Sequence, residues 1–171
     1  GARCTTCLDT PGHGLISRPM RFDKFTIKSQ EALSAAQANA TERGHGTIEA
    51  AHLLQALLAQ PEGSTIPVLQ KLGIAIDPLK ARVQKALDQQ PKVSGTQPGL
   101  SQRLQRILEA SFREATAMKD EYVSTEHLVI AIASEKDDPM GRLLRDVGAS
   151  RDAILQALLS VRGSARVTDQ D

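Results

Sequence analysis

The chain repeats itself at a fixed offset of 75 residues, and the alignment of the two copies needs no gap. Between the identical positions apolar residues replace apolar residues, as Ile48 and Val123 do. Two equivalent copies predict one pseudo-symmetric domain with a seam between them that suits an elongated ligand. The identical pairs include Leu33 and Leu108, Ala40 and Ala115, His52 and His127, Leu69 and Leu144, and Gly73 and Gly148.

Each copy has the pattern of four helices, which predicts an all-α fold of two four-helix repeats. Thr26 is the expected N-cap of the first helix, and Asp77 is the expected N-cap of the fourth, with Pro78 as its first helical residue. The second copy repeats this plan. In the first copy we expect helices from Thr26 to Arg43, from about Glu49 to just before Pro61, from Pro67 to Leu72 and from Asp77 onward.

Composition limits the classes of function. The 171 residues are 40% hydrophobic, enough to bury one core, and the lack of Trp with only one Tyr and three Phe makes that core aliphatic. A formal net charge of +1 gives no field that would steer the chain to nucleic acid or to an anionic membrane. No apolar run approaches the roughly 20 residues that a membrane-spanning helix needs.

The repeat pattern divides the chain into five parts. Residues 20–90 and 100–162 are the two repeats, and residues 91–99, rich in Pro, Gly and polar side chains, are an exposed connector. Residues 1–19 are interpreted as an artificial leader, because Met20 resembles a natural start. Residues 163–171 have no periodicity and are interpreted as the start of a linker.

Both cysteines lie within residues 1–19, so the repeats contain no disulfide framework, as in proteins of a reducing compartment. A rival interpretation of this segment is a zinc site made by Cys4, Cys7 and His13. A structural zinc site needs four ligands, and a second cysteine pair is absent. Metal analysis with and without residues 1–19 separates the two interpretations.

Motifs of catalysis and nucleotide binding are absent from the sequence. The most enzyme-like feature is the repeated pair His52 and His127, which could supply two acid-base groups across the seam. A histidine on an apolar helical face more often packs and bonds a neighbouring loop carbonyl. Glu49 and Glu126 resemble an acid pair, yet the helix dipole alone favours acids in a first turn. We therefore expect no catalysis by this segment.

Three segments carry a family resemblance: Met20–Leu33 (MRFDKFTIKSQEAL), Pro91–Gly95 (PKVSG) and Lys119–Leu128 (KDEYVSTEHL). With the repeated Ile/Val-x-x-x-His-Leu helices, they resemble the N-terminal domain of the ClpB-type bacterial disaggregases over about residues 20–168. The resemblance implies a cytoplasmic, homohexameric AAA+ parent that cooperates with the DnaK system. It implies unfolded or aggregated polypeptides as partners. ATP and magnesium would bind in modules beyond Asp171, and no cofactor or metal is expected in this segment.

The resemblance also implies which residues bind substrate. Its functionally implicated polar positions fall on Thr26, Asp120 and Glu126, whose structural alternatives are an N-cap, a loop acid and a first-turn acid. The family's apolar groove between the repeats suggests three further residues, for which core burial is the alternative. These are Leu104, Leu108 and Val123.

A competing function is an adaptor-docking domain of a ClpC-like unfoldase, because the double repeat alone fits any Clp N-terminal domain. Such a domain binds a folded partner in a saturable one-to-one complex. A substrate-recognition domain instead binds unfolded chain weakly and with little sequence preference.

Overall fold

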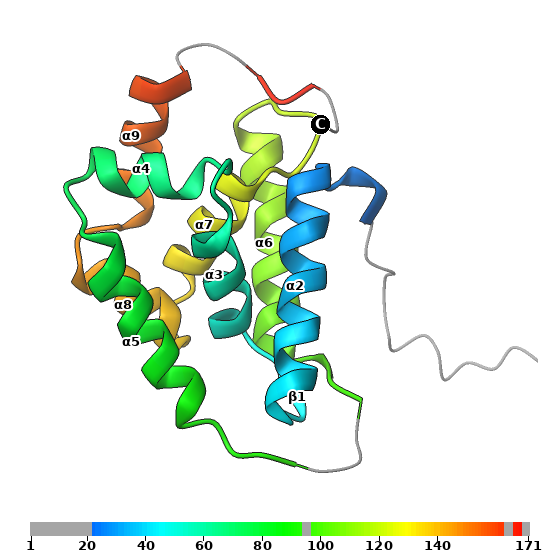
Figure 1. Ribbon diagram of the computed structural model, residues 1–171. Coiled ribbons are helices and arrows are strands. Elements are labelled where there is room, and N and C mark those ends of the chain that lie inside the picture. Colours follow the sequence, from blue (N-terminus) through cyan, green and yellow to red (C-terminus); the bar gives the residue numbers. More distant parts are fainter. Residues whose placement is uncertain (1–21, 94–96, 163–165, 169–171) are drawn as a thin grey trace, which may run out of the picture.

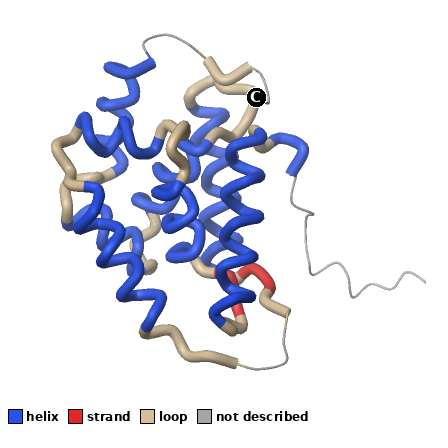
Figure 2. The backbone as a smooth tube through the Cα atoms, viewed as in Figure 1, coloured by secondary structure: helices blue, strands red, loops and turns tan. Residues whose placement is uncertain are grey.

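The computed structural model describes residues 22–93, 97–162 and 166–168, and these residues are mostly helical (Figures 1 and 2). A 3-10 turn (Phe22–Lys24) precedes eight α-helices in the described residues. The first repeat forms α2 (Ile27–Arg43), α3 (Ala50–Ala59), α4 (Thr65–Lys71) and α5 (Ile76–Asp88). The second repeat forms α6 (Gln102–Ala117), α7 (Thr125–Ser134), α8 (Pro139–Asp146) and α9 (Arg151–Arg162).

A shift of 75 residues carries each helix of the first repeat onto its counterpart to within one residue at either end. The all-α fold of two four-helix repeats is therefore confirmed. Thr26 caps α2 by accepting a hydrogen bond from the Ser29 amide at 3.2 Å, and Ser101 caps α6 by accepting one from the Leu104 amide at 3.1 Å.

The predicted starts of the third and fourth helices were each wrong by two residues. Helix α4 begins at Thr65 rather than Pro67, and α5 begins at Ile76 with Ala75 as its N-cap, so Asp77 lies inside the first turn. The first amides of a helix have no partner within it, and a proline is therefore tolerated anywhere in the first turn. The two prolines mark the first turn without marking its first residue.

The repeats are joined by two short strand pairings along the seam. Strand β1 (Thr47–Ile48) runs parallel to β2 (Gly99–Leu100), with Ile48 opposite Leu100, and Phe25 forms a parallel bridge with Val123. The offset of 75 residues relates Phe25 to Leu100 and Ile48 to Val123, so the two pairings are symmetry mates. Each repeat thus pairs its entry segment with the other repeat, which makes the two repeats one domain.

Helices α3 and α7 lie in the middle of the domain and pack against each other (Figure 1). Both are buried around most of their circumference, as expected for central helices, while their neighbours bury one face only. Helix α4 of the first repeat packs on α9 of the second. Within the part of the chain that the structure describes, no helix combines the length and apolarity needed to cross a membrane.

Candidate functional site

Thr26 and Val123 belong to the seam itself. The Thr26 amide donates to the Val123 carbonyl at 3.0 Å, and the Ser29 hydroxyl donates to the same carbonyl at 2.9 Å. The Thr26 hydroxyl donates to Ser29 Oγ at 3.1 Å, so the cap of α2 and the seam share one hydrogen-bonded chain. Both Thr26 and Val123 are buried, and these contacts give Thr26 a structural role.

Asp120, in the loop between α6 and α7, is also buried and accepts three hydrogen bonds. Its Oδ2 accepts from His127 Nε2 at 2.8 Å. Its Oδ1 accepts from Arg162 Nη2 at 2.6 Å and from the Val167 amide at 2.8 Å. This carboxylate therefore ties the start of α7 to the end of α9 and to the residues that follow.

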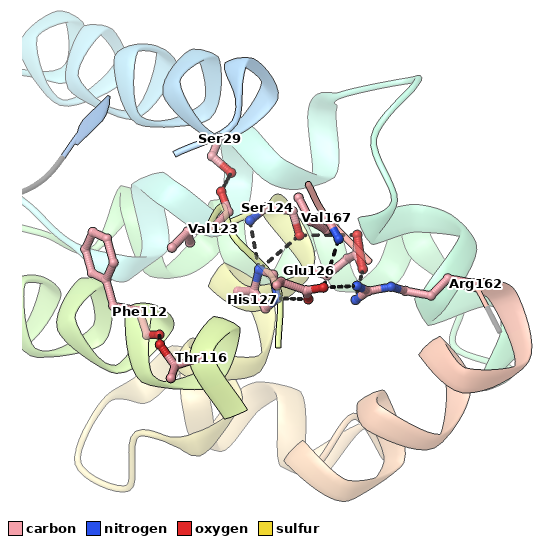
Figure 3. Close-up of polar contacts among 10 residues, drawn as sticks. Ser29, Phe112, Thr116, Val123, Ser124, Glu126, His127, Arg162 and Val167 are labelled. Atoms are coloured by element: carbon pink, nitrogen blue, oxygen red, sulfur yellow. Dashed lines mark hydrogen bonds and ion pairs between the residues drawn. The ribbon is translucent and has the colours of Figure 1, made fainter. Parts of the chain in front are cut away.

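Glu126 completes the same cluster from the first turn of α7. Its Oε2 accepts from Arg162 Nη1 at 3.1 Å, and its Oε1 accepts from the Ser124 hydroxyl at 3.2 Å. The forked guanidinium of Arg162 bridges two carboxylates, a geometry that lysine cannot reproduce. Figure 3 shows Arg162 extending from α9 toward Glu126 and Val167. The Asp120 cluster comprises Asp120, Ser124, Glu126, His127 and Arg162.

The hydrogen bonds fix the charge states within the cluster. His127 Nδ1 accepts the Ser124 amide at 2.8 Å, so the proton of the neutral ring is on Nε2, toward Asp120. Burial lowers the pKa of His127 despite the nearby carboxylates of Asp120 and Glu126. Burial would raise the pKa of Asp120, but hydrogen bonds from Arg162, the Val167 amide and His127 bring it below its usual range. Asp120 is therefore ionised beside a neutral imidazole.

The first repeat builds the equivalent position without acids. His52 Nδ1 accepts the Glu49 amide at 2.8 Å, and His52 Nε2 lies 2.8 Å from Nδ1 of His45, the counterpart of Asp120. Burial, followed by repulsion from His45, lowers the pKa of His52 to about 4. The counterparts of Glu126 and Arg162 are Ala51 and Leu87. The charged cluster is therefore specific to the second repeat.

These contacts place the repeated histidines in structural roles. His52 and His127 have no exposed surface, and both orient the N-terminus of a central helix. The prediction that they bond a loop carbonyl was wrong, because each accepts a backbone amide and directs its other nitrogen to a side chain. Glu49 is the N-cap residue of α3 rather than a first-turn acid, so its position does not correspond to that of Glu126.

Leu104 and Leu108 lie on the buried face of α6 and have no exposed surface, and Val123 is almost as deeply buried. In this conformation their side chains are core and do not line an open groove. Helical periodicity identified an apolar face but not what covers that face. The prediction that these residues contact substrate would require the domain to open.

An open apolar groove of about 270 Å³ lies between the end of α6 and α9. Leu159, whose side chain is the most exposed among the large apolar residues described, stands on its wall at 67% exposure. Arg162 lines the groove as well, so the Asp120 cluster forms one of its borders. The lining residues are Ala117, Met118, Lys119, Leu155, Leu158, Leu159, Arg162 and Arg166.

A second cavity, of about 600 Å³, lies between β1, the connector and the starts of α6 and α8. It is more mixed in character, since Glu49, Arg103 and Asp138 share its walls with Pro91, Val93 and other apolar groups. The described ranges contain no cluster of three or more His, Cys, Asp or Glu side chains arranged to hold a metal ion. The zinc hypothesis for Cys4, Cys7 and His13 lies outside the described residues.

Sequence reasoning missed both Arg162 and the groove. Leu155, Leu158 and Leu159 have the spacing of core residues, and periodicity does not show where the covering elements end. Arg162 belongs to no recognisable sequence motif. The available signal was the comparison of the repeats, because Arg162 replaces Leu87 just where Asp120 replaces His45.

The family model described as "Clp repeat (R) N-terminal domain" matches residues 24–147. The chaperone protein ClpB of Rhodopirellula baltica is 41% identical over 150 residues, which cover 87% of this chain and 17% of that relative. The N-terminal domain of Hsp104 from Candida albicans superposes with a TM-score of 0.76 at 18% identity, covering 86% of this chain and 97% of that one.

A ClpV N-domain solved in complex with a VipB peptide has the same fold, with a TM-score of 0.69 at 20% identity over 89% of this chain and 99% of that one. The chain belongs to the Clp repeat N-terminal domain family, and its resemblance to ClpB is confirmed. Domains of this family are non-catalytic N-terminal domains. The chain spans less than a fifth of the curated ClpB relative.

Proposed function

We propose that this domain recognises exposed apolar segments of unfolded or aggregated polypeptides and passes them to the ATPase ring of a ClpB-type disaggregase. The parent is a cytoplasmic homohexamer that works with the DnaK system and binds ATP and magnesium in modules outside this segment. The observation that carries the proposal is the open groove between α6 and α9, because a large exposed side chain, Leu159, borders it in a chaperone-family domain.

The chemistry of the groove suits a client that is selected by exposure rather than by sequence. Met118 is unbranched and adapts to differently shaped partners, and the leucines of α9 offer aliphatic surface without directional bonds. Ordering an unfolded chain costs entropy, so the affinity is expected to be micromolar or weaker. Because burial of apolar surface drives the contact, added salt should weaken it little.

The polar residues Thr26, Asp120 and Glu126 support this site from beneath. Asp120 and Glu126 hold Arg162 at the border of the groove, and Thr26 stabilises the seam on which the loop before α7 rests. Leu104, Leu108 and Val123 belong to the buried apolar core of the domain. Under this proposal the three polar residues affect client binding without contacting the client, and the three apolar residues contribute stability as part of the core.

The test is a titration with one client protein, once in its unfolded and once in its native state. The amide signals of the domain report the binding. A permanently unfolded client should shift signals of Met118, Leu155 and Leu159, and the same client in its native state should not. Leu159→Ser should weaken binding while leaving the melting temperature unchanged. Val93→Ser is the matched control, because Val93 is exposed to 46% but lines the other cavity.

A second candidate function is docking of a folded adaptor, as in a ClpC-like unfoldase. The observation in its favour is that the related ClpV N-domain was solved with a VipB peptide, a defined partner. Equal binding of native and unfolded client, or a saturable complex with a folded protein on another face, would favour docking and reject client recognition.

A further inference from the structure

Residues 166–168, called here the exit segment, lie against the loop that precedes α7. The Val167 carbonyl accepts from the amides of Glu121 and Tyr122 at 2.8 and 3.3 Å, and the Val167 amide donates to Asp120 Oδ1 at 2.8 Å. Arg166 lines the same groove as Leu159. The exit segment is therefore part of the border of the proposed client site.

The first repeat holds a segment at the equivalent place. Lys92, the counterpart of Val167, forms an antiparallel bridge with His45, and the Val93 amide donates to the Gly44 carbonyl at 2.7 Å. Helices α5 and α6 flank this connector, and α9 precedes the exit segment. In the second repeat the carboxylate of Asp120 bonds the exit segment in addition to the backbone bonds of Val167.

The charged residues of the Asp120 cluster surround this additional bond. Arg162 ends α9 with one guanidinium nitrogen on Asp120 and the other on Glu126, and Asp120 also accepts the Val167 amide. The counterparts His45, Ala51 and Leu87 show that the repeat folds without these charges. These charges are therefore not a general requirement of the repeat fold.

We propose that Arg162 is a positioning residue that latches the exit segment against the client groove, and that Asp120 and Glu126 act on client binding through Arg162. This inference rests on the proposed function for its client-binding part only. The latch itself is a property of the domain in the absence of a client. Charge-assisted bonds in a mostly buried setting are strong enough to hold such a segment.

Hydrogen exchange tests the latch without any client. In the full chain, Arg162→Leu should lower the protection of the Glu121 and Tyr122 amides by about tenfold, because the segment that covers them is released. Arg162→Lys should have an intermediate effect, since an ammonium keeps the charge but does not span both carboxylates. Unchanged protection in Arg162→Leu would overturn the latch whatever the client data show.

A triple variant distinguishes release of the latch from loss of folding. The change Asp120→His, Glu126→Ala and Arg162→Leu gives the second repeat the residues of the first, leaving no unpaired buried charge. Its circular dichroism should match that of the wild type, and its Glu121 and Tyr122 amides should exchange faster. Retained protection in the folded triple variant would also reject the latch.

Client binding then shows whether the acids act through Arg162. Glu126→Gln in the wild type should raise the client Kd by about threefold, and in the Arg162→Leu background it should change the Kd by less than about twofold. Equal effects in both backgrounds would mean that Glu126 touches the client itself, which contradicts the proposal. If the wild type binds no unfolded client, the proposed function fails, and hydrogen exchange still decides the latch.

Discussion

His45 and Asp120 occupy the same position in the two repeats, and each lies 2.8 Å from Nε2 of the histidine that orients a central helix. In the second repeat the acceptor is an ionised carboxylate neutralised by Arg162. In the first repeat the acceptor is a second buried imidazole beside Arg43 and Lys92, and both cations lower the pKa of His45 after burial does. One backbone position thus supports two opposite electrostatic environments.

This difference predicts that the first repeat is the more acid-sensitive of the two, although burial lowers the pKa of His127 as well. The pKa of His52 is about 4 in the folded domain, below its ordinary value of 6.5, so the unfolded chain takes up a proton at higher pH. The free energy of unfolding should therefore fall as pH drops from about 7 toward 4, by at most about 3 kcal/mol from this group. Urea unfolding at a series of pH values measures it.

The control for this prediction is His45→Asp, which copies the second repeat. A carboxylate beside His52 favours its protonated form, so the loss of stability between about pH 7 and 5 should be smaller in the variant. Arg43 and Lys92 would compensate the new charge, as both already lie close enough to affect His45. Identical pH profiles for the two proteins would exclude the histidine pair as the cause.

The close approach of α8 to the end of α7 predicts that Gly141→Ala destabilises the domain. A Cβ at Gly141 would overlap the Glu135 carbonyl oxygen and lie 2.7 Å from the Ile132 carbonyl oxygen. Because both contacts are backbone atoms, the helix must shift, at a cost of about 2 kcal/mol or more. Gly99→Ala is the control, since no atom lies within 4 Å of its Cβ. Thermal melting compares them, and equal stability would contradict this packing.

Much of the fold could be predicted because the repeat and the helix signals agree. The offset of 75 residues alone pairs the helices, and Thr26 is the cap that its position predicted. The early starts of α4 and α5 were missed because a proline fits anywhere in a first turn. The exchange of entry segments between repeats gave no sequence signal, since two-residue strands have no measurable alternation.

The candidate site was predicted less completely. Asp120 and Glu126 followed from the family resemblance, and the structure brings them together on Arg162, which lies 42 and 36 residues further along the chain. Local spacing patterns in the sequence do not predict a contact between residues so far apart in the chain. Leu108 and Leu159 look alike in sequence, yet one is fully buried and the other two-thirds exposed, because burial depends on elements far away in the chain.

Leu108 provides a direct test of the boundary between core and groove. Leu108→Ala should lower the free energy of unfolding by about 3 kcal/mol, because the removed methyl groups leave a cavity in a closed core. Client affinity measured on the folded protein should stay within about twofold of wild type. Guanidinium unfolding and client titration give the two values. A Leu108→Ala variant that keeps its stability but loses client binding would show that Leu108 contacts the client.

Thr26 is predicted to stabilise the seam. Its contribution to stability as a helix cap can be measured separately from its contribution through the bond to Ser29. Thr26→Ala removes the acceptor for the Ser29 amide and the donor to Ser29 Oγ, so it should cost about 1 to 2 kcal/mol of stability. Thr26→Ser keeps both bonds and should cost less than half as much stability.

Ser101→Ala is the control, because it removes the equivalent cap of α6, whose side chain makes no such further bond toward the seam. Differential scanning calorimetry should therefore place Thr26→Ala below Ser101→Ala in melting temperature. Equal losses at the two positions would show that Thr26 contributes only as a helix cap and that the bond from Ser29 to Val123 does not depend on it.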